Sequence, residues 1–316
     1  MSVSVKSQKI SSVGDASLWQ AFITLHIVGG QVGLPVILLT WAFSKSVVRH
    51  PTLVNLWITF VVYSISYCIL LYSGQVGATT TSSSPSNVCL VQSAMIYGAP
   101  PMSAVAGLLV VCQIWQTFQE PSFNTNPTKW PNSVKIFLVL PYLVFFVFAL
   151  TAGILGALHP ERIYNHNGLY CSLHSANFSN YIVPIFCVTV MSMMVILEVI
   201  LVVRYYRMWA HTSRVFPLAS RRTSPSLLLR VLLFDVYSIV VFSVAVFFLS
   251  DFQTHWPYMV QASIPLTAVA IFGSQAVRLC THLSFRYRPN GPNGHHRTCS
   301  ELGVSGDQRT HPPKTF

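Results

Sequence analysis

Seven long apolar blocks, separated by short polar or proline-containing segments, make up most of the chain. Crossing about 30 Å of hydrocarbon takes a helix of about 20 apolar residues, and every block meets that length. The separating segments hold proline, glycine, serine, threonine or charge, which interrupt helices. The pattern predicts an all-α membrane protein, a seven-transmembrane helix bundle. The predicted spans are Leu18–Ser44, Leu53–Ser73, Leu90–Phe118, Val134–Leu158, Tyr181–Val203, Leu227–Leu249 and Val260–His282.

The two ends of the chain differ from this core. Residues 1–17 are small and polar, which predicts a disordered extracellular N-terminus before the transmembrane domain of residues 18–282. Residues 283–316 hold several prolines, glycines and asparagines and are expected to form a disordered cytoplasmic tail. The first apolar block is longer than the apolar region of a signal peptide, so we expect it to serve as an anchor.

The composition excludes a water-soluble fold. Hydrophobic residues make up 52% of the chain and charged residues only 9%, whereas a soluble domain carries about 25% charged residues. The formal net charge of +11 does not indicate a nucleic-acid partner, because the basic residues lie in loops and in the tail rather than on a continuous basic face. The lipid bilayer is therefore the predicted surrounding.

The distribution of basic residues predicts the orientation. Of the 19 Lys and Arg residues, three (Lys6, Lys9 and Arg162) fall on one side of the predicted bundle, which leaves 16 on the other. Basic residues concentrate on the cytoplasmic side, so the N-terminus is expected outside and the C-terminus in the cytoplasm. Around the first span alone the two sides are equal, and the later loops decide. We expect a multi-pass protein of the plasma membrane.

Two features of the predicted extracellular side agree with this orientation. Asn177 begins an Asn-Phe-Ser glycosylation sequence in the loop after the fourth span. Cys89 and Cys171 are the two of the seven cysteines that fall on this side. Because extracellular loops are oxidising, we expect the two to form a disulfide, the alternative being two unrelated thiols.

Several short sequences resemble a known family. Seven spans with a bridged cysteine at the start of the third resemble G-protein-coupled receptors. Arg49-His50-Pro51, Asn55, the Tyr63–Tyr67 run, Arg230 with Phe234, and Phe272-Gly273-Ser274-Gln275 resemble the seven-span receptor-like proteins of basidiomycete fungi. The resemblance covers residues 18–285 and implies a cell-surface receptor that senses an extracellular ligand and signals to a heterotrimeric G protein.

The third span ends without an Asp/Glu-Arg-Tyr triplet, and the sixth and seventh spans lack Cys-Trp-x-Pro and Asn-Pro-x-x-Tyr. These absences exclude close kinship with the rhodopsin-like receptors of animals.

Charged residues within the predicted spans require an explanation, because each costs about 2.5–3.5 kcal/mol at mid-bilayer. We hypothesise a switch cluster in the cytoplasmic third, formed by Glu198, Arg230, Asp235 and Arg278. The alternative is a static ion pair that makes the two acids tolerable in the membrane. His26 lies alone within the first span, and a single intramembrane histidine is usually a hydrogen-bonded packing residue.

The extracellular halves of the spans supply candidate ligand-binding residues. Aromatic walls with a few amides suit a small ligand that is not strongly charged, although Trp and Tyr also belong to the membrane interface. The candidates are Gln92, Tyr97, Tyr181, Phe247, Trp256, Gln261, Tyr67 and Tyr72.

The third cytoplasmic loop is strongly basic. Arg207, Arg214, Arg221 and Arg222 are the predicted G-protein contact, although they would also attract anionic lipid. Ser224 follows Arg221-Arg222-Thr223 as a candidate phosphorylation site.

Other functional classes fit less well. A retinal protein needs a lysine in the seventh span, and residues 260–282 contain none. No set of metal ligands or nucleophile–base pair is evident, so we expect no metal, no cofactor and no enzyme activity. The alternatives to a receptor are a small-molecule transporter and a non-signalling membrane scaffold. Transporters often contain repeated halves, and the sequence shows no such repeat.

Overall fold

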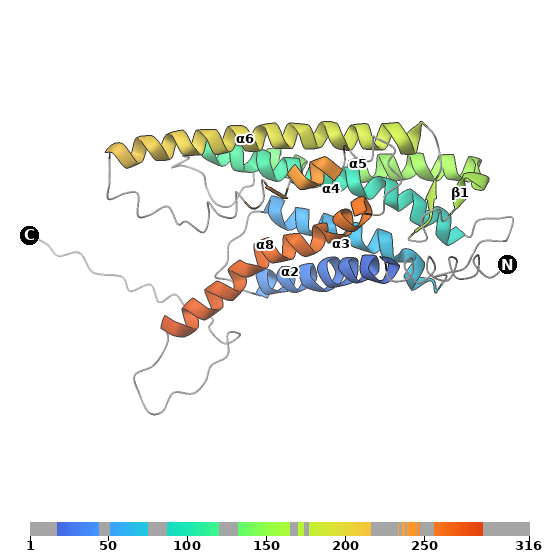
Figure 1. The fold of residues 1–316 in the computed structure, drawn as a ribbon, viewed down its shortest axis with the longest axis horizontal. Helices are drawn as coiled ribbons and strands as arrows, with labels where there is room; N and C mark the ends of the chain where they lie inside the picture. Colours follow the sequence, from blue (N-terminus) through green and yellow to red (C-terminus); the bar gives the residue numbers. More distant parts are fainter. Residues whose placement is uncertain are drawn as a thin grey trace, which may run out of the picture.

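The computed structural model describes residues 18–43, 51–74, 87–119, 132–164, 170–173, 177–215 and 256–286, and parts of 233–246. Long helices lie side by side, and a short strand pair lies at one end of them (Figure 1). After a helical segment at residues 18–25, the elements are η1 (His26–Gly33), α2 (Leu34–Phe43), α3 (Pro51–Tyr72), α4 (Asn87–Gln119), α5 (Asn132–Leu158), η2 (Pro160–Arg162), β1 (Ile163–Tyr164), β2 (Ser172–Leu173), η3 (Phe178–Ile182), α6 (Val183–Val215) and α8 (Trp256–Arg286).

Five helical segments are long and apolar enough to cross a membrane. They are Leu18–Phe43, Pro51–Tyr72, Asn87–Gln116, Val134–Leu158 and Phe178–Arg204. These segments confirm the first five predicted spans as helices. The predicted sixth span lies mostly outside the described residues. The seventh falls within α8, of which the described residues include the apolar stretch Pro257–Ile271. The count of seven therefore stays a prediction.

The outward face of α5 shows that these helices belong in lipid. Val139, Leu143, Phe146, Leu150 and Ile154 are each 57–63% exposed, and they follow one another at intervals of three or four residues. Such spacing places them along one side of the helix. A protein dissolved in water rarely exposes so long an apolar stripe, because hydrating it is costly. With five helices of membrane-crossing length, the chain is an integral membrane protein.

The centre of the bundle is α4, which packs against α3, α5 and α6. Pro100 and Pro101 lie inside this helix, yet it continues unbroken to Gln119. Proline lacks the N–H that a helix needs, and such gaps are tolerated in membranes where neighbouring groups supply other hydrogen bonds. The Ser103 hydroxyl donates to the Pro100 carbonyl at 2.9 Å, so local side-chain bonding accompanies the proline pair.

A polar contact joins α3 to α5 away from the strand pair. The Asn55 side-chain amide donates to the Leu138 carbonyl at 3.1 Å, and its oxygen accepts from the Tyr142 hydroxyl at 2.8 Å. Asn55 is buried, so both ends of its amide need a partner. This residue, one of those that carry the family resemblance, therefore ties two spans together.

The first span approaches its neighbours through glycines in η1. This segment is a π-helix, and the Leu34 N–H donates to the Gly29 carbonyl five residues earlier. A β-carbon on Gly29 would lie 2.4 Å from the Leu266 nitrogen of α8, and one on Gly30 would lie 1.7 Å from the Ser64 Oγ of α3. The glycines therefore allow contact at backbone distance, as is common between membrane helices.

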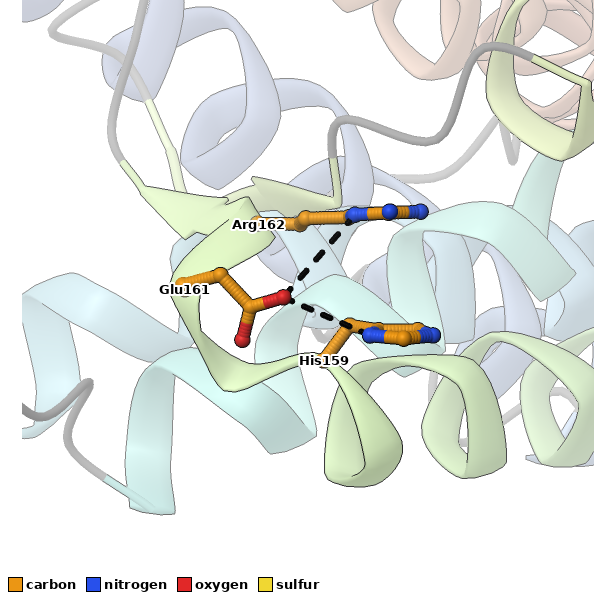
Figure 2. Close-up of polar contacts among 3 residues, drawn as sticks. All are labelled: His159, Glu161 and Arg162. Atoms are coloured by element: carbon orange, nitrogen blue, oxygen red, sulfur yellow. Dashed lines mark ion pairs between the residues drawn. The ribbon is translucent and has the colours of Figure 1, made fainter.

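The chain leaves α5 through a short exposed turn. The Glu161 carboxylate lies 3.3 Å from the His159 Nδ1 and 4.0 Å from the Arg162 Nε, and Figure 2 shows it between the two side chains. All three side chains are largely exposed, so these pairs contribute little to stability. The turn leads into β1, which pairs antiparallel with β2 through Ile163 opposite Leu173.

The predicted terminal segments lie almost entirely outside the described residues. Residues 1–17 are among the undescribed ones, as are residues 287–316. Helix α8 continues to Arg286, beyond the predicted domain boundary at His282.

Candidate functional site: a capped aromatic and polar core

A disulfide fastens the loop after α5 to the first turn of α4. Cys89 and Cys171 are bonded, with their α-carbons 5.4 Å apart, and both are buried. The predicted pairing is confirmed. We call the part of the bundle at this bond the disulfide end, and residues 170–173 the cap segment. The strand pair β1–β2 marks this end in Figure 1.

Hydrogen bonds hold the cap segment against the helices below it. The Cys171 N–H donates to the Gln92 side-chain oxygen at 3.1 Å, and the Gln92 amide donates in turn to the Tyr67 carbonyl at 3.2 Å. The Tyr97 hydroxyl donates to the Leu173 carbonyl at 2.7 Å. The side chain of Gln92 is completely buried, so its two hydrogen bonds connect the cap segment to both α4 and α3.

The ring of Tyr170 closes the core from above. It packs edge-on against Tyr67 with ring centroids 5.2 Å apart, and it contacts the rings of Phe22 and Tyr258 at 6.1 and 6.2 Å. Burial raises the pKa of the Tyr170 phenol well above its usual value of 10, so the group stays neutral. The cap segment thus adds an aromatic ring to a core that is already aromatic.

Below Tyr170 lies a buried histidine surrounded by rings. His26, the first residue of η1, is stacked on Tyr67 with centroids 5.0 Å apart and an interplanar angle of 7°. Phe22 contacts it edge-on at 4.7 Å, and Tyr63 lies at 5.7 Å. Both His26 and Tyr63 are at most 1% exposed. Residues 18–33, α3, α4 and the cap-facing end of α8 all contribute to the packed cluster at this group.

Polar atoms in this core differ in how they are satisfied. The Tyr67 hydroxyl accepts a hydrogen bond from the Gln261 amide at 3.1 Å. Neither ring nitrogen of His26 has a hydrogen-bond partner among the described residues, whereas the Tyr63 hydroxyl interacts with Tyr67 and Gln261. Each unsatisfied buried polar group costs about 1–3 kcal/mol. A buried imidazole with both nitrogens unsatisfied calls for an explanation.

The predicted ligand-binding residues divide into two groups. Tyr67, Gln92, Tyr97 and Gln261 lie together in or beside this core. Tyr181 is 58% exposed on the outer surface, and Tyr72 is 55% exposed, with its hydroxyl bonded to Gln31. The side chain of Trp256 and the whole of Phe247 lie outside the described residues.

Sequence reasoning missed four members of the core. Phe22 and His26 are four residues apart in the first span, and Tyr63 and Tyr67 repeat that spacing in the second. Residues four apart share a helix face, so these two aromatic pairs could have been found by their spacing. Tyr170 could not have been found by spacing, because it belongs to a loop whose position depends on the disulfide.

The other predicted sites are described only in part. Glu198 is buried in α6, but Arg230 and Asp235 lie outside the described residues, as does the Arg278 side chain. The switch cluster therefore stays a prediction. Asn177 is exposed at the disulfide end, next to the buried Phe178. Its glycosylation also stays a prediction.

The basic residues near the opposite end are likewise only partly visible. Arg207 is exposed on α6, and Arg204 beside it lies over the Trp115 ring of α4 at 5.3 Å. Arg214 lies in α6, but its side chain is not described, and Arg221, Arg222 and Ser224 fall outside the described residues.

Comparison with known proteins gives no assignment. No protein-family model matches the chain, and a search of curated proteins finds no match.

We predict that replacing Gln92 by leucine will loosen the cap segment. Leucine has a similar volume but leaves the Cys171 N–H and the Tyr67 carbonyl without their partners. Each lost buried bond costs about 1–3 kcal/mol, so amide hydrogen exchange in residues 170–173 should rise about tenfold or more. Exchange measured by mass spectrometry on the peptide containing Cys171 tests this.

The matched control for this experiment is Gln31→Leu. Gln31 lies in the first span and bonds to Tyr72 and to the Ser64 carbonyl, not to the cap segment. The Gln31→Leu variant should leave amide hydrogen exchange at residues 170–173 unchanged. Equal exchange in the two variants would mean that Gln92 does not hold the cap segment.

Proposed function

We propose that the chain is a seven-span receptor of the plasma membrane, with its N-terminus outside and its C-terminus in the cytoplasm. It senses a small, uncharged extracellular ligand and signals to a heterotrimeric G protein. The observation that carries this proposal is the closed core at the disulfide end: aromatic and polar side chains from several spans converge beneath a cap segment that a disulfide holds in place. A lining that is mostly apolar with a few placed polar groups is the composition that small-molecule sites share.

The chemistry of the two ends supports the orientation. Disulfides form in oxidising compartments, so the end that carries Cys89–Cys171 suits the extracellular side. Asn177 lies at the same end and is exposed, as a glycosylated residue must be. Arg204 and Arg207 lie toward the far end of α6, which suits the cytoplasmic side.

The nature of the core supports an uncharged ligand. The helical segments that form this core, residues 18–33, α3, α4 and residues 256–271 of α8, contain no Asp, Glu, Lys or Arg. A charged ligand would lose its hydration there without an opposite charge to replace it, at a cost of several kcal/mol. A neutral ligand carries no such penalty.

The long cytoplasmic extension of α6 supports the G-protein partner. The helix continues to Val215, beyond the membrane-crossing segment that ends at Arg204. It carries Arg207 and Arg214 toward the basic loop that contains Arg221 and Arg222. A basic projection of this kind offers a contact surface for an acidic partner protein.

Guanine-nucleotide exchange tests this function. Membranes containing the protein are incubated with a panel of fungal Gα subunits, with and without broad ligand extracts, and exchange is compared with that of empty membranes. We expect exchange above background that is lost when Arg207, Arg214, Arg221 and Arg222 are replaced by alanine. Removing the same number of charges from the tail, at Arg288, Arg297, Arg309 and Lys314, is the matched control and should leave exchange intact. Silence across the panel would favour the transporter or the scaffold.

A further inference from the structure

The lipid-facing side of α6 ends in two arginines. The exposed apolar side chains of this face are Ile196, Val199, Ile200 and Val203. Arg204 follows Ile200 by four residues, Arg207 follows Val203 by four, and both arginines are exposed. Residues four apart share a helix face, so the two arginines continue the surface that the apolar side chains present to the lipid.

The lipid-facing side of α5 ends in the same way. Lys135 lies in the first turn of this helix and is exposed, and the exposed residues Val139 and Leu143 follow it at intervals of four. At the disulfide end, the exposed residues are instead uncharged: Leu158 closes α5, and Tyr181 precedes α6. The lipid-facing stripes of both helices are therefore basic at one end only.

These basic residues lie at the depth where acyl chains give way to headgroups. The membrane-crossing segments of the two helices are Val134–Leu158 and Phe178–Arg204, which places Lys135 and Arg204 at their ends. Long basic side chains at such positions extend along apolar surface and place their charge among the headgroups.

An aromatic ring orients one of these cations. The Arg204 guanidinium lies over the Trp115 ring of α4, 5.3 Å from its centroid. A guanidinium stacked on a ring still presents the N–H groups of its edge, and two of them match two oxygens of a phosphate. The helices offer no exposed carboxylate in its place, because α4 and α5 contain no Asp or Glu and Glu198, the acid of α6, is buried.

The balance of charge selects an anionic headgroup. The ion pairs of the described residues lie at the disulfide end, around Glu161, so Lys135, Arg204 and Arg207 have no carboxylate partner within the described part of the chain. A zwitterionic headgroup brings an ammonium group together with its phosphate, whereas a headgroup of net negative charge complements several cations at once.

We propose that the ends of α5 and α6 opposite the disulfide bind anionic phospholipid. Arg204 and Arg207 of α6 and Lys135 of α5 donate hydrogen bonds to headgroup phosphates, and the apolar stripes beside them contact the acyl chains. In the orientation proposed above, this end faces the cytoplasmic leaflet, where anionic lipids concentrate. The test uses lipid and protein alone, so it can fail or succeed independently of coupling to a G protein.

Lipid titration followed by native mass spectrometry measures this binding. Phosphatidylserine or phosphatidylcholine with identical acyl chains is added to the full-length protein in a nonionic detergent, and the fraction carrying one lipid gives the affinity. We expect tighter binding of phosphatidylserine, and Arg204→Gln should weaken it about fivefold, the contribution of one basic residue near an anionic surface. Adding Lys135→Gln should weaken it further, while Arg207 stays unchanged because it belongs to the proposed G-protein contact.

Two further variants separate the site from general effects of substitution. The charge-conserving pair Arg204→Lys/Lys135→Arg should keep the preference for phosphatidylserine, which a variant that had merely lost its fold would not. Arg162→Gln removes an exposed charge from the turn at the disulfide end and should leave the preference unchanged.

Three results would overturn the proposal. Equal affinity of the unmodified protein for the two lipids would show that the charge of the headgroup is not recognised. Equal weakening by Arg162→Gln and Arg204→Gln would show attraction by net charge without a site. Competition by glycerophosphoserine, which lacks acyl chains, as strong as that by the lipid would show a site for soluble phosphate groups rather than for a membrane lipid.

Discussion

Replacing Gly29 by alanine should lower the free energy of unfolding by about 3 kcal/mol, at the upper end of the cost of overpacking. The added β-carbon would lie 2.4 Å from the Leu266 nitrogen and 2.7 Å from its α-carbon. These are backbone atoms of α8, so no side chain can rotate to make room. The first span and α8 would have to separate, and the core around His26, which both help to form, would open with them. Thermal unfolding in detergent, with the fraction of monodisperse protein, measures the effect.

Gly153→Ala is the matched control for this substitution. Gly153 also lies inside a spanning helix, but a β-carbon there would lie 3.7 Å from the nearest atom, the Ala94 β-carbon, which is an ordinary contact. We expect it to leave stability unchanged or slightly raised, since alanine favours helix more than glycine does. Comparable loss from both substitutions would mean that close approach at Gly29 does not matter.

Gly30 provides a test by rescue. Its added β-carbon would collide with the Ser64 side chain, 1.7 Å from the Oγ and 2.3 Å from the Cβ, rather than with backbone. Gly30→Ala should therefore be destabilising alone and partly restored by Ser64→Gly, which removes both atoms. Residues in direct contact show this kind of non-additivity, whereas independent sites add.

Loss of the Cys89–Cys171 bond should be the second substitution with a large effect on the free energy of unfolding. For a loop of about 80 residues the entropy of the unfolded chain predicts about 4.5 kcal/mol, and the spans on either side already restrict that loop, so we expect about 2–4 kcal/mol. Cys89→Ser should lower the unfolding temperature and speed hydrogen exchange in the cap segment, because Tyr170 and Leu173 lose their anchor. Thermal unfolding and exchange measured on the same sample provide both values.

Two comparisons make the disulfide prediction specific. Cys112→Ser changes a free cysteine of α4, the helix that also carries Cys89, and should not affect the cap segment. The double variant Cys89→Ser/Cys171→Ser should be no less stable than either single variant, since one bond is lost in every case. Additive losses would show that each cysteine acts separately.

The sequence by itself determined the class of the protein and much of its layout. Five of the predicted spans are helices at nearly the predicted residues, because the length of an apolar block that crosses lipid is set by the thickness of the bilayer. The disulfide was predictable for a similar reason. The predicted orientation places two cysteines on the extracellular side, where oxidising conditions favour a disulfide between them. Both inferences depend on local composition and on the membrane, not on how the helices pack.

The makeup of the candidate site was decided by the tertiary structure. Gln92 and Tyr97 were predicted as ligand contacts, and in the structure both bond to the cap segment. Tyr181 and Tyr72 have the same composition signal as Tyr67 but lie on the exposed surface. A hydropathy pattern places a residue at a depth in the membrane, but it does not fix the rotation of its helix.

His26 shows the same limit most clearly. In the sequence it is a single histidine in an apolar span, and the usual expectation is a packing residue with a hydrogen bond. Only the approach of α3 at the glycines of η1 and the fold of the cap segment bring Tyr63, Tyr67 and Tyr170 to it. These contacts join residues far apart in the chain, so no local pattern encodes them. The bilayer fixed the spans, and the packing between the helices decided which side chains form the site.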